Sequence, residues 1–110
     1  MPNGNPLLVK IHVDASGNFT YTPAVLHAAP GSTVVWWCDV GNFVCSFQGK
    51  TPFDRVEHHG HKSAEPLVET ALTIPTGVTL GTYHYSVAVA VENQGCKVYV
   101  NGGCPELVIP

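Results

Sequence analysis

Residues 81–100 read GTYHYSVAVAVENQGCKVYV, and this stretch decides the fold. Aromatic and β-branched residues occupy every second position of its first half. One side of an extended chain would carry Tyr83, Tyr85, Val87, Val89 and Val91, and the other side His84, Ser86, Ala88 and Ala90. A strict period of two in such residues predicts a long, half-buried β-strand.

A second strand is predicted directly after this one. Residues 92–95, ENQG, supply turn chemistry, and residues 97–100 follow as a strand with Val98 and Val100 facing inward. A two-stranded hairpin is not stable alone in water. The rest of the chain must therefore supply a second layer.

The remaining sequence shows the same short period between turn signals. Further strands are predicted at 7–13, 19–23, 24–27, 32–38, 43–47, 68–74 and 105–109, with a long surface loop over 48–66. This pattern predicts an all-β fold, a Greek-key β-sandwich of about seven to nine strands. We expect a single domain over residues 1–110, with a short C-terminal extension from about residue 102. An immunoglobulin-like sandwich is the main alternative.

Composition excludes several classes of protein. The chain of 110 residues is 45% hydrophobic and 12% charged, which argues against disorder. Its net charge of −3 includes only five Lys and Arg, so we expect no nucleic-acid binding. No apolar run is long enough for a membrane span, and the first residues are not a signal peptide. We expect a cytoplasmic protein if Met1 is the native start, and an exported one if its cysteines form disulfides.

Two short motifs resemble those of cupredoxins, the plastocyanin and azurin family of blue copper proteins. Residues 81–87, GTYHYSV, resemble the family's Gly-x-Tyr-x-Tyr-x-Cys segment, and residues 30–36, PGSTVVW, resemble its Pro-Gly-Asp-x-Val-x-Trp segment. The resemblance covers about residues 7–101 in order and spacing. Residues 104–107, CPEL, also resemble the last strand of a group of small bacterial cupredoxin-like domains, with Cys in place of Asp.

The copper ligands of that family are replaced in this chain. A type 1 copper site needs two imidazoles and a thiolate, usually with a weak axial thioether. The matching positions here hold Phe43, Val87, and approximately Ala90 and Gln94. The resemblance therefore implies a cupredoxin-like fold and argues against blue-copper electron transfer.

The leading hypothesis is a copper-free binding or structural module without a cofactor, whose partner is another protein or a second copy of the chain. Phe43 and Val87, with Phe53, form the candidate apolar interaction surface, and ordinary core is the alternative for the first two. Ser46 and Ser86 lie in predicted strands without a nucleophile motif, so we expect no enzyme activity.

A histidine-rich segment supplies the alternative function. His58, His59 and His61 lie within four residues, and two of them could bind copper or zinc if a third ligand came from elsewhere. The other interpretation is a solvated loop.

Four cysteines lie outside any Cys-x-x-Cys pattern. We expect two local disulfides, Cys38 with Cys45 and Cys96 with Cys104. Buried free thiols are the close alternative.

Overall fold

The computed structural model describes residues 6–67, 71–91, 97–101 and 105–110. These residues form an all-β fold of two mixed sheets. Its strands are β1 (Leu7–Val13), β2 (Phe19–Thr22), β3 (Val25–His27), β4 (Thr33–Cys38), β5 (Asn42–Phe47), β6 (Glu57–Gly60), β7 (Leu72–Thr73), β8 (Gly81–Val91), β9 (Lys97–Asn101) and β10 (Glu106–Ile109).

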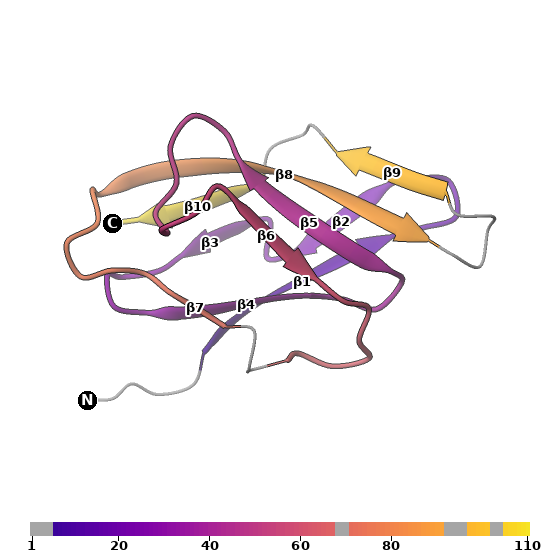
Figure 1. The fold of residues 1–110 in the computed structure, drawn as a ribbon, viewed down its shortest axis with the longest axis horizontal. Helices are drawn as coiled ribbons and strands as arrows, with labels where there is room; N and C mark the ends of the chain where they lie inside the picture. The colour runs from indigo at the N-terminus through magenta and orange to yellow at the C-terminus, as the bar shows by residue number, and fades with distance from the viewer. Residues whose placement is uncertain (1–5, 68–70, 92–96, 102–104) are drawn as a thin grey trace.

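The two sheets lie one behind the other (Figure 1). The four-stranded sheet has the order β2-β1-β4-β7, with β1 and β4 parallel. The six-stranded sheet has the order β3-β10-β8-β5-β6, and β9 pairs with the second half of β8. No helix long and apolar enough to cross a membrane occurs among the described residues.

Strand β8 confirms the alternation seen in the sequence. Its residues from Tyr83 to Val91 alternate between buried and more exposed positions along the whole strand. One edge of β8 pairs with β5, where Phe43 lies opposite Val89, and the other edge pairs with β10 and then β9. Three neighbouring strands therefore take their register from β8.

The core lies between the sheets. Strands β1 and β4 contribute Val9, Ile11, Val34 and Trp36, and the six-stranded sheet contributes Phe47, Tyr85, Val87, Val89, Leu107 and Ile109. Each of these side chains is at most 5% exposed. The last two belong to β10, so the strand predicted at 105–109 lies inside the six-stranded sheet, between β3 and β8.

One strand was missed by the sequence pattern. Residues 57–60 form β6 inside the segment predicted as a loop, and they pair with β5. In the segment predicted as a strand over 68–74, the described residues form the short strand β7, and residues 68–70 lie outside the described chain.

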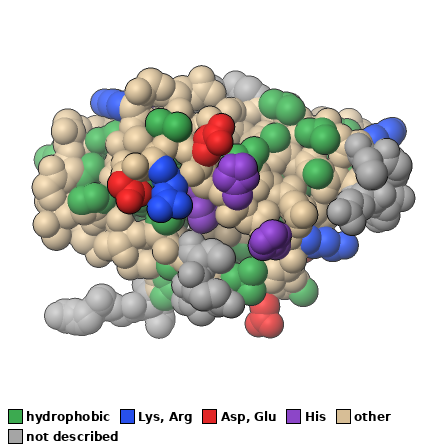
Figure 2. Space-filling view, in the orientation of Figure 1, with side chains coloured by type: hydrophobic (Ala, Val, Ile, Leu, Met, Phe, Trp, Pro, Cys, Tyr) green, Lys and Arg blue, Asp and Glu red, His purple; other side chains and the backbone are tan. Residues whose placement is uncertain are grey.

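The predicted facing of β9 was wrong. Val98 and Val100 are 62% and 70% exposed, and Tyr99 faces inward instead. The register explains this, because Val98 lies opposite Ala90 and Val100 opposite Ala88, which are on the outward side of β8. Figure 2 shows hydrophobic side chains gathered on the near face, toward the end where β8 and β9 lie.

Candidate functional site

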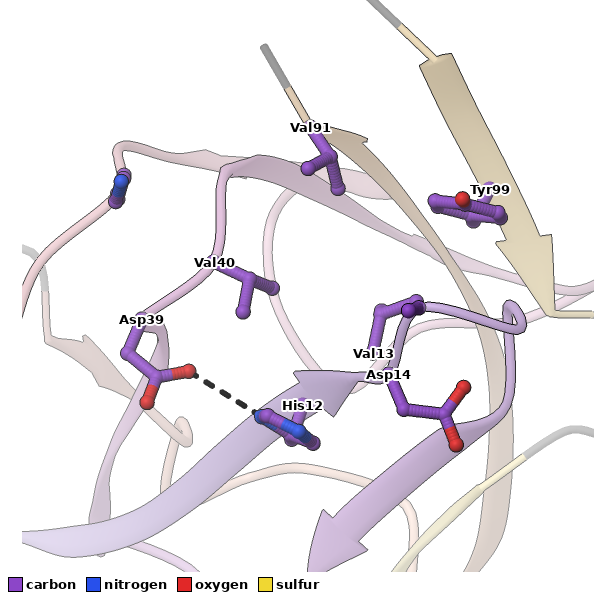
Figure 3. A pocket seen from close by; sticks show the side chains of 9 residues that line it. His12, Val13, Asp14, Asp39, Val40, Val91 and Tyr99 are labelled. Atoms are coloured by element: carbon purple, nitrogen blue, oxygen red, sulfur yellow. Dashed lines mark hydrogen bonds and ion pairs between the residues drawn. The ribbon is translucent and has the colours of Figure 1, made fainter. Parts of the chain in front are cut away.

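A pocket of about 400 Å³ opens at one end of the molecule, between the two sheets (Figure 3). The turn from β1 to β2, the turn from β4 to β5, and strands β8 and β9 surround it. Its apolar lining consists of Val13, Ala15, Val40, Val91 and Tyr99, and its polar lining consists of His12, Asp14, Asp39 and Lys62. This volume lies within the usual range for a small-molecule site.

Asp14 is fixed by the turn that follows β1. Its Oδ1 accepts hydrogen bonds of 2.9 Å from the backbone nitrogens of Ser16 and Asn18. These bonds, that from Asn18 first, hold the pKa of Asp14 below its ordinary value. Gly17 completes the turn with a φ of 86°, in the left-handed region that favours glycine. The rim therefore carries a fixed, ionised carboxylate.

Asp39 lies across the pocket opening from that turn, and it links the β4–β5 turn to β1. Its Oδ2 is 3.4 Å from Lys10 Nζ, and its Oδ1 is 3.5 Å from His12 Nδ1, the contact drawn in Figure 3. Burial raises the pKa of Asp39, but the hydrogen bond to His12 and the charge of Lys10 outweigh it, so the pKa is lowered. This carboxylate is ionised, and the positive charge of Lys10 already balances its negative charge.

Lys62 is placed by its backbone. Its N–H donates a 2.8 Å hydrogen bond to Asn42 Oδ1, and residue 62 forms a parallel bridge with Cys38 at the end of β4. Lys62 and Asp14 form no ion pair with any residue that the structure describes. The rim thus offers one cation and one anion that no described residue neutralises and that can bind charged groups of a ligand.

The floor of the pocket is apolar. Val13 and Val91 are 4% and 6% exposed, and Val40 packs against the same core. Tyr99 adds an aromatic wall, since its ring packs closely over Gly17. An apolar floor below a rim with a few fixed polar groups is the usual composition of a ligand site.

A second pocket, of about 270 Å³, has a simpler lining. Asp54 and Arg55 are its charged residues, and they bind each other through a 3.2 Å contact from Arg55 Nε to Asp54 Oδ1. Its other described residues are Phe53, Ala71, Leu72, Thr73 and Pro75. Because its charges are mutually satisfied, it offers less to a polar ligand.

The structure does not bring the three clustered histidines together. His58 and His59 are neighbours on strand β6, so their side chains point to opposite faces. His58 is 7% exposed and packs against Trp36 and Phe43, whereas the side chain of His59 is 74% exposed and lies 3.5 Å from Glu57. His61 is exposed after the strand. In the described ranges, no group of three or more His, Cys, Asp or Glu residues could hold a metal ion.

His58 is instead a buried core residue. Its Nε2 has no hydrogen-bond partner. Burial, followed by the charges of Arg55 and His59, lowers the pKa of His58 below its ordinary value of 6.5. His58 is therefore neutral at pH 7.

The predicted disulfide between Cys38 and Cys45 is wrong. Both side chains are free thiols and fully buried, on strands that belong to different sheets. Burial raises the pKa of both thiols, which disfavours the thiolate that disulfide formation requires. The alternative of buried free thiols describes this pair. The other predicted pair, Cys96 with Cys104, lies outside the described residues.

The predicted apolar interaction surface is also wrong. Phe43, Phe53 and Val87 are 5%, 8% and 1% exposed, and all three belong to the core. The ring of Phe43 covers Gly60 of β6, and Val87 lies opposite Cys45 between the sheets. Of the other positions matched to copper ligands, Ala90 lies on the outward side of β8, and Gln94 is outside the described residues.

The residues of the pocket were not singled out in the sequence. Residues 14–18 were part of a predicted turn, but Asp39, Lys62 and Tyr99 come from three further segments that only the fold brings together. No family model matches the chain, and no curated protein matches it.

Proposed function

We propose that this chain is a copper-free binding module with a Greek-key, cupredoxin-like fold, and that it binds a small zwitterionic molecule in the pocket lined by Asp14, Lys62 and Tyr99. The observation that carries the proposal is the pocket itself. It combines an apolar floor with a carboxylate, Asp14, and an ammonium group, Lys62, that form no ion pair within the described part of the chain.

The rim charges favour a ligand with both signs of charge. Asp14 would accept a hydrogen bond from the ligand's ammonium group, and Lys62 would donate one to its carboxylate. The charge of Asp39 is balanced by Lys10, and its Oδ1 contacts His12, so it would contribute hydrogen-bond acceptors without a large net field. A molecule of one charge sign would meet repulsion from one of the two unpaired groups.

The floor favours a ligand with an apolar part. Val13, Val40 and Val91 would remove aliphatic surface of the ligand from water, which contributes about 25 cal/mol per Å² buried. The ring of Tyr99 would stack against the same part. Free amino acids with aliphatic or aromatic side chains combine these properties, and they are the class we propose.

The cupredoxin-like assignment rests on the two sequence motifs and is compatible with the two-sheet fold. Phe43, Val87 and Ala90, at the positions matched to copper ligands, have no metal-binding atoms in their side chains. We therefore propose a function without type 1 copper chemistry.

Binding is a better account of the rim than catalysis. A general acid or base works best when its pKa lies near the operating pH. The surroundings of Asp14 and Asp39 lower the pKa of both carboxyl groups, away from neutrality. They are suited to accept hydrogen bonds from a ligand rather than to transfer protons.

Calorimetric titration of the purified chain with leucine, phenylalanine, glycine and glucose tests this function. We expect saturable binding of leucine or phenylalanine, weaker binding of glycine, and none of glucose. Asp14→Asn keeps the turn-forming side-chain oxygen and removes the charge, and Lys62→Met keeps the aliphatic stem.

Each of these variants should weaken binding by about tenfold or more, equivalent to about 1.4 kcal/mol. Asp54→Asn is the matched control, because Asp54 lies outside this pocket. Absence of saturable binding by every amino acid, or affinities that Asp14→Asn and Lys62→Met leave unchanged, would overturn the proposal.

A further inference from the structure

Strand β9 presents the two most exposed large hydrophobic side chains among the described residues. Val98 and Val100 are 62% and 70% exposed, and they lie on the same side of the strand. Isolated exposed hydrophobic residues are common on protein surfaces, but an apolar pair on one strand at the edge of a sheet is a site where another chain can pair.

The apolar surface continues from β9 across the neighbouring strands. Val100 lies opposite Ala88, which lies opposite Val44 on β5, and Val98 lies opposite Ala90. Val44, Ala88 and Ala90 are partly exposed. Figure 2 shows hydrophobic side chains on the face that carries β8 and β9. We call these five residues the β9 face: Val44, Ala88, Ala90, Val98 and Val100.

Strand β9 lies at an edge of the described part of the six-stranded sheet. Among the strands that the structure describes, only β8 pairs with it. Its inward side is held in place, because the Tyr99 ring packs over Gly17 and Asn101 Nδ2 donates a 2.9 Å hydrogen bond to Tyr21 Oη. The strand is therefore already formed before it meets a partner, which lowers the entropic cost of binding.

We propose that β9 pairs antiparallel with β9 of a second copy of this chain, about a two-fold axis that passes beside Tyr99. In this register Val98 lies opposite Val100 of the partner subunit, and Val100 lies opposite the partner's Val98. Lys97 lies opposite the partner's Asn101. Apolar cross-strand pairs of this kind stabilise a sheet.

The sequence of β9 is what selects a second copy as the partner. A two-fold interface must be self-complementary, because both copies contribute the same surface to it. The order Lys-Val-Tyr-Val-Asn meets this requirement. In the dimer, all four valines, two from each copy, lie opposite one another, and the lysines of the two copies lie at opposite ends of the interface. A register centred on Val98 or Val100 would leave two of the four valines outside the paired segment.

In the predicted dimer, the six-stranded sheets of the two copies join through β9 into one continuous sheet. The β9 faces of the two copies would join into one apolar surface that runs across the axis. This proposal is independent of the pocket's ligand, because the pocket lies on the inward side of β9 and the valines lie on its outward side.

Sedimentation velocity of the purified full chain over a wide concentration range tests the proposal. We expect a concentration-dependent dimer. Val98→Lys with Val100→Lys should abolish it, because the four lysines would face one another across the axis and like charges opposite each other destabilise a sheet. Leu80→Lys is the matched control, since Leu80 is 58% exposed and lies outside β9. It should dimerise like the wild-type chain.

The double variant should fold, because both valines are exposed in the single chain. Its far-ultraviolet circular dichroism spectrum should match that of the wild-type chain, and if it does not, Val98→Thr with Val100→Thr replaces it. A wild-type chain that stays monomeric at every concentration would overturn the proposal. So would a dimer that persists in the folded double variant, because its interface would then lie elsewhere.

Discussion

The indole Nε1 of Trp36 donates a 3.1 Å hydrogen bond to the hydroxyl oxygen of Tyr85. Trp36 belongs to β4 in the four-stranded sheet and Tyr85 to β8 in the six-stranded sheet, so the bond joins the two layers through the core. The two rings also meet edge to face, with 5.6 Å between their centroids. Both side chains are at most 2% exposed, and water cannot replace either group.

Tyr85→Phe should lower the free energy of unfolding by about 1–3 kcal/mol, because it leaves the buried Nε1–H of Trp36 without an acceptor. Urea denaturation followed by fluorescence measures this. Tyr83→Phe is the matched control on the same strand. The Tyr83 hydroxyl donates to the backbone oxygen of Thr79, an exposed residue whose carbonyl can bond to water instead. An equal or smaller loss for Tyr85→Phe than for Tyr83→Phe would contradict this account.

Gly41→Ala should destabilise the chain by about 1–3 kcal/mol or more, because the added Cβ would meet the backbone oxygen of Ala90. Gly41 is buried in the turn before β5, where the backbone of β8 approaches closely. Gly77→Ala meets no atom within 4 Å and should change stability by no more than about 0.5 kcal/mol. The midpoints of urea denaturation measure both. If the two substitutions had the same effect, the close approach of β5 and β8 at this turn would be wrong.

The buried His58 should make stability depend on pH. Its pKa is lowered in the folded chain, so between that value and 6.5 the unfolded chain binds a proton that the folded chain does not. The free energy of unfolding should therefore fall as the pH decreases from about 7 to about 5, and rise again on return to pH 7. Denaturation curves across this range measure the slope.

His58→Gln should reduce this slope, whatever its effect on stability at pH 7. His59→Gln is the control, because the side chain of His59 is 74% exposed. A slope that His58→Gln leaves intact would show that other groups cause the pH dependence.

Cys38 and Cys45 should react with an alkylating reagent only after the chain unfolds, because both are fully buried and their thiols are held protonated. Mass spectrometry can follow them together, since trypsin leaves both in one peptide, residues 11–50. After alkylation in denaturant without reductant, that peptide should carry two labels. An unlabelled peptide lighter by two hydrogen atoms would contradict the free-thiol structure.

The sequence correctly predicted the strands in which apolar and polar residues alternate, so that one face is buried and the other is exposed. Strand β8 is the clearest case, and its neighbour β5 follows the same rule. Strand β6 was missed because its inward residue is His58, which a hydrophobic pattern counts as polar. Burial of this histidine against Trp36 and Phe43 depends on strands far away in the sequence.

The facing of β9 was missed for a different reason. Its pattern Val-Tyr-Val offers apolar residues to both faces, so the period of two does not decide which one is buried. The register with β8 decides it, with Lys97 opposite Val91, and this turns Tyr99 inward. The pocket depends on this choice, because Tyr99 forms one of its walls, and five separate segments of the chain supply its lining.

The most direct test of the proposed ligand site is a nuclear magnetic resonance titration of the isotope-labelled chain with leucine. We expect shifts of backbone amide signals that concentrate at residues 12–15, 39–40 and 62 and at Tyr99, and that saturate together with one affinity. Lys62→Met should shift the saturation of these signals to about tenfold higher leucine concentration. Saturable shifts that cluster elsewhere, such as around Phe53 and Arg55, or spectra that do not change, would contradict a zwitterion-binding pocket at this end of the sheets.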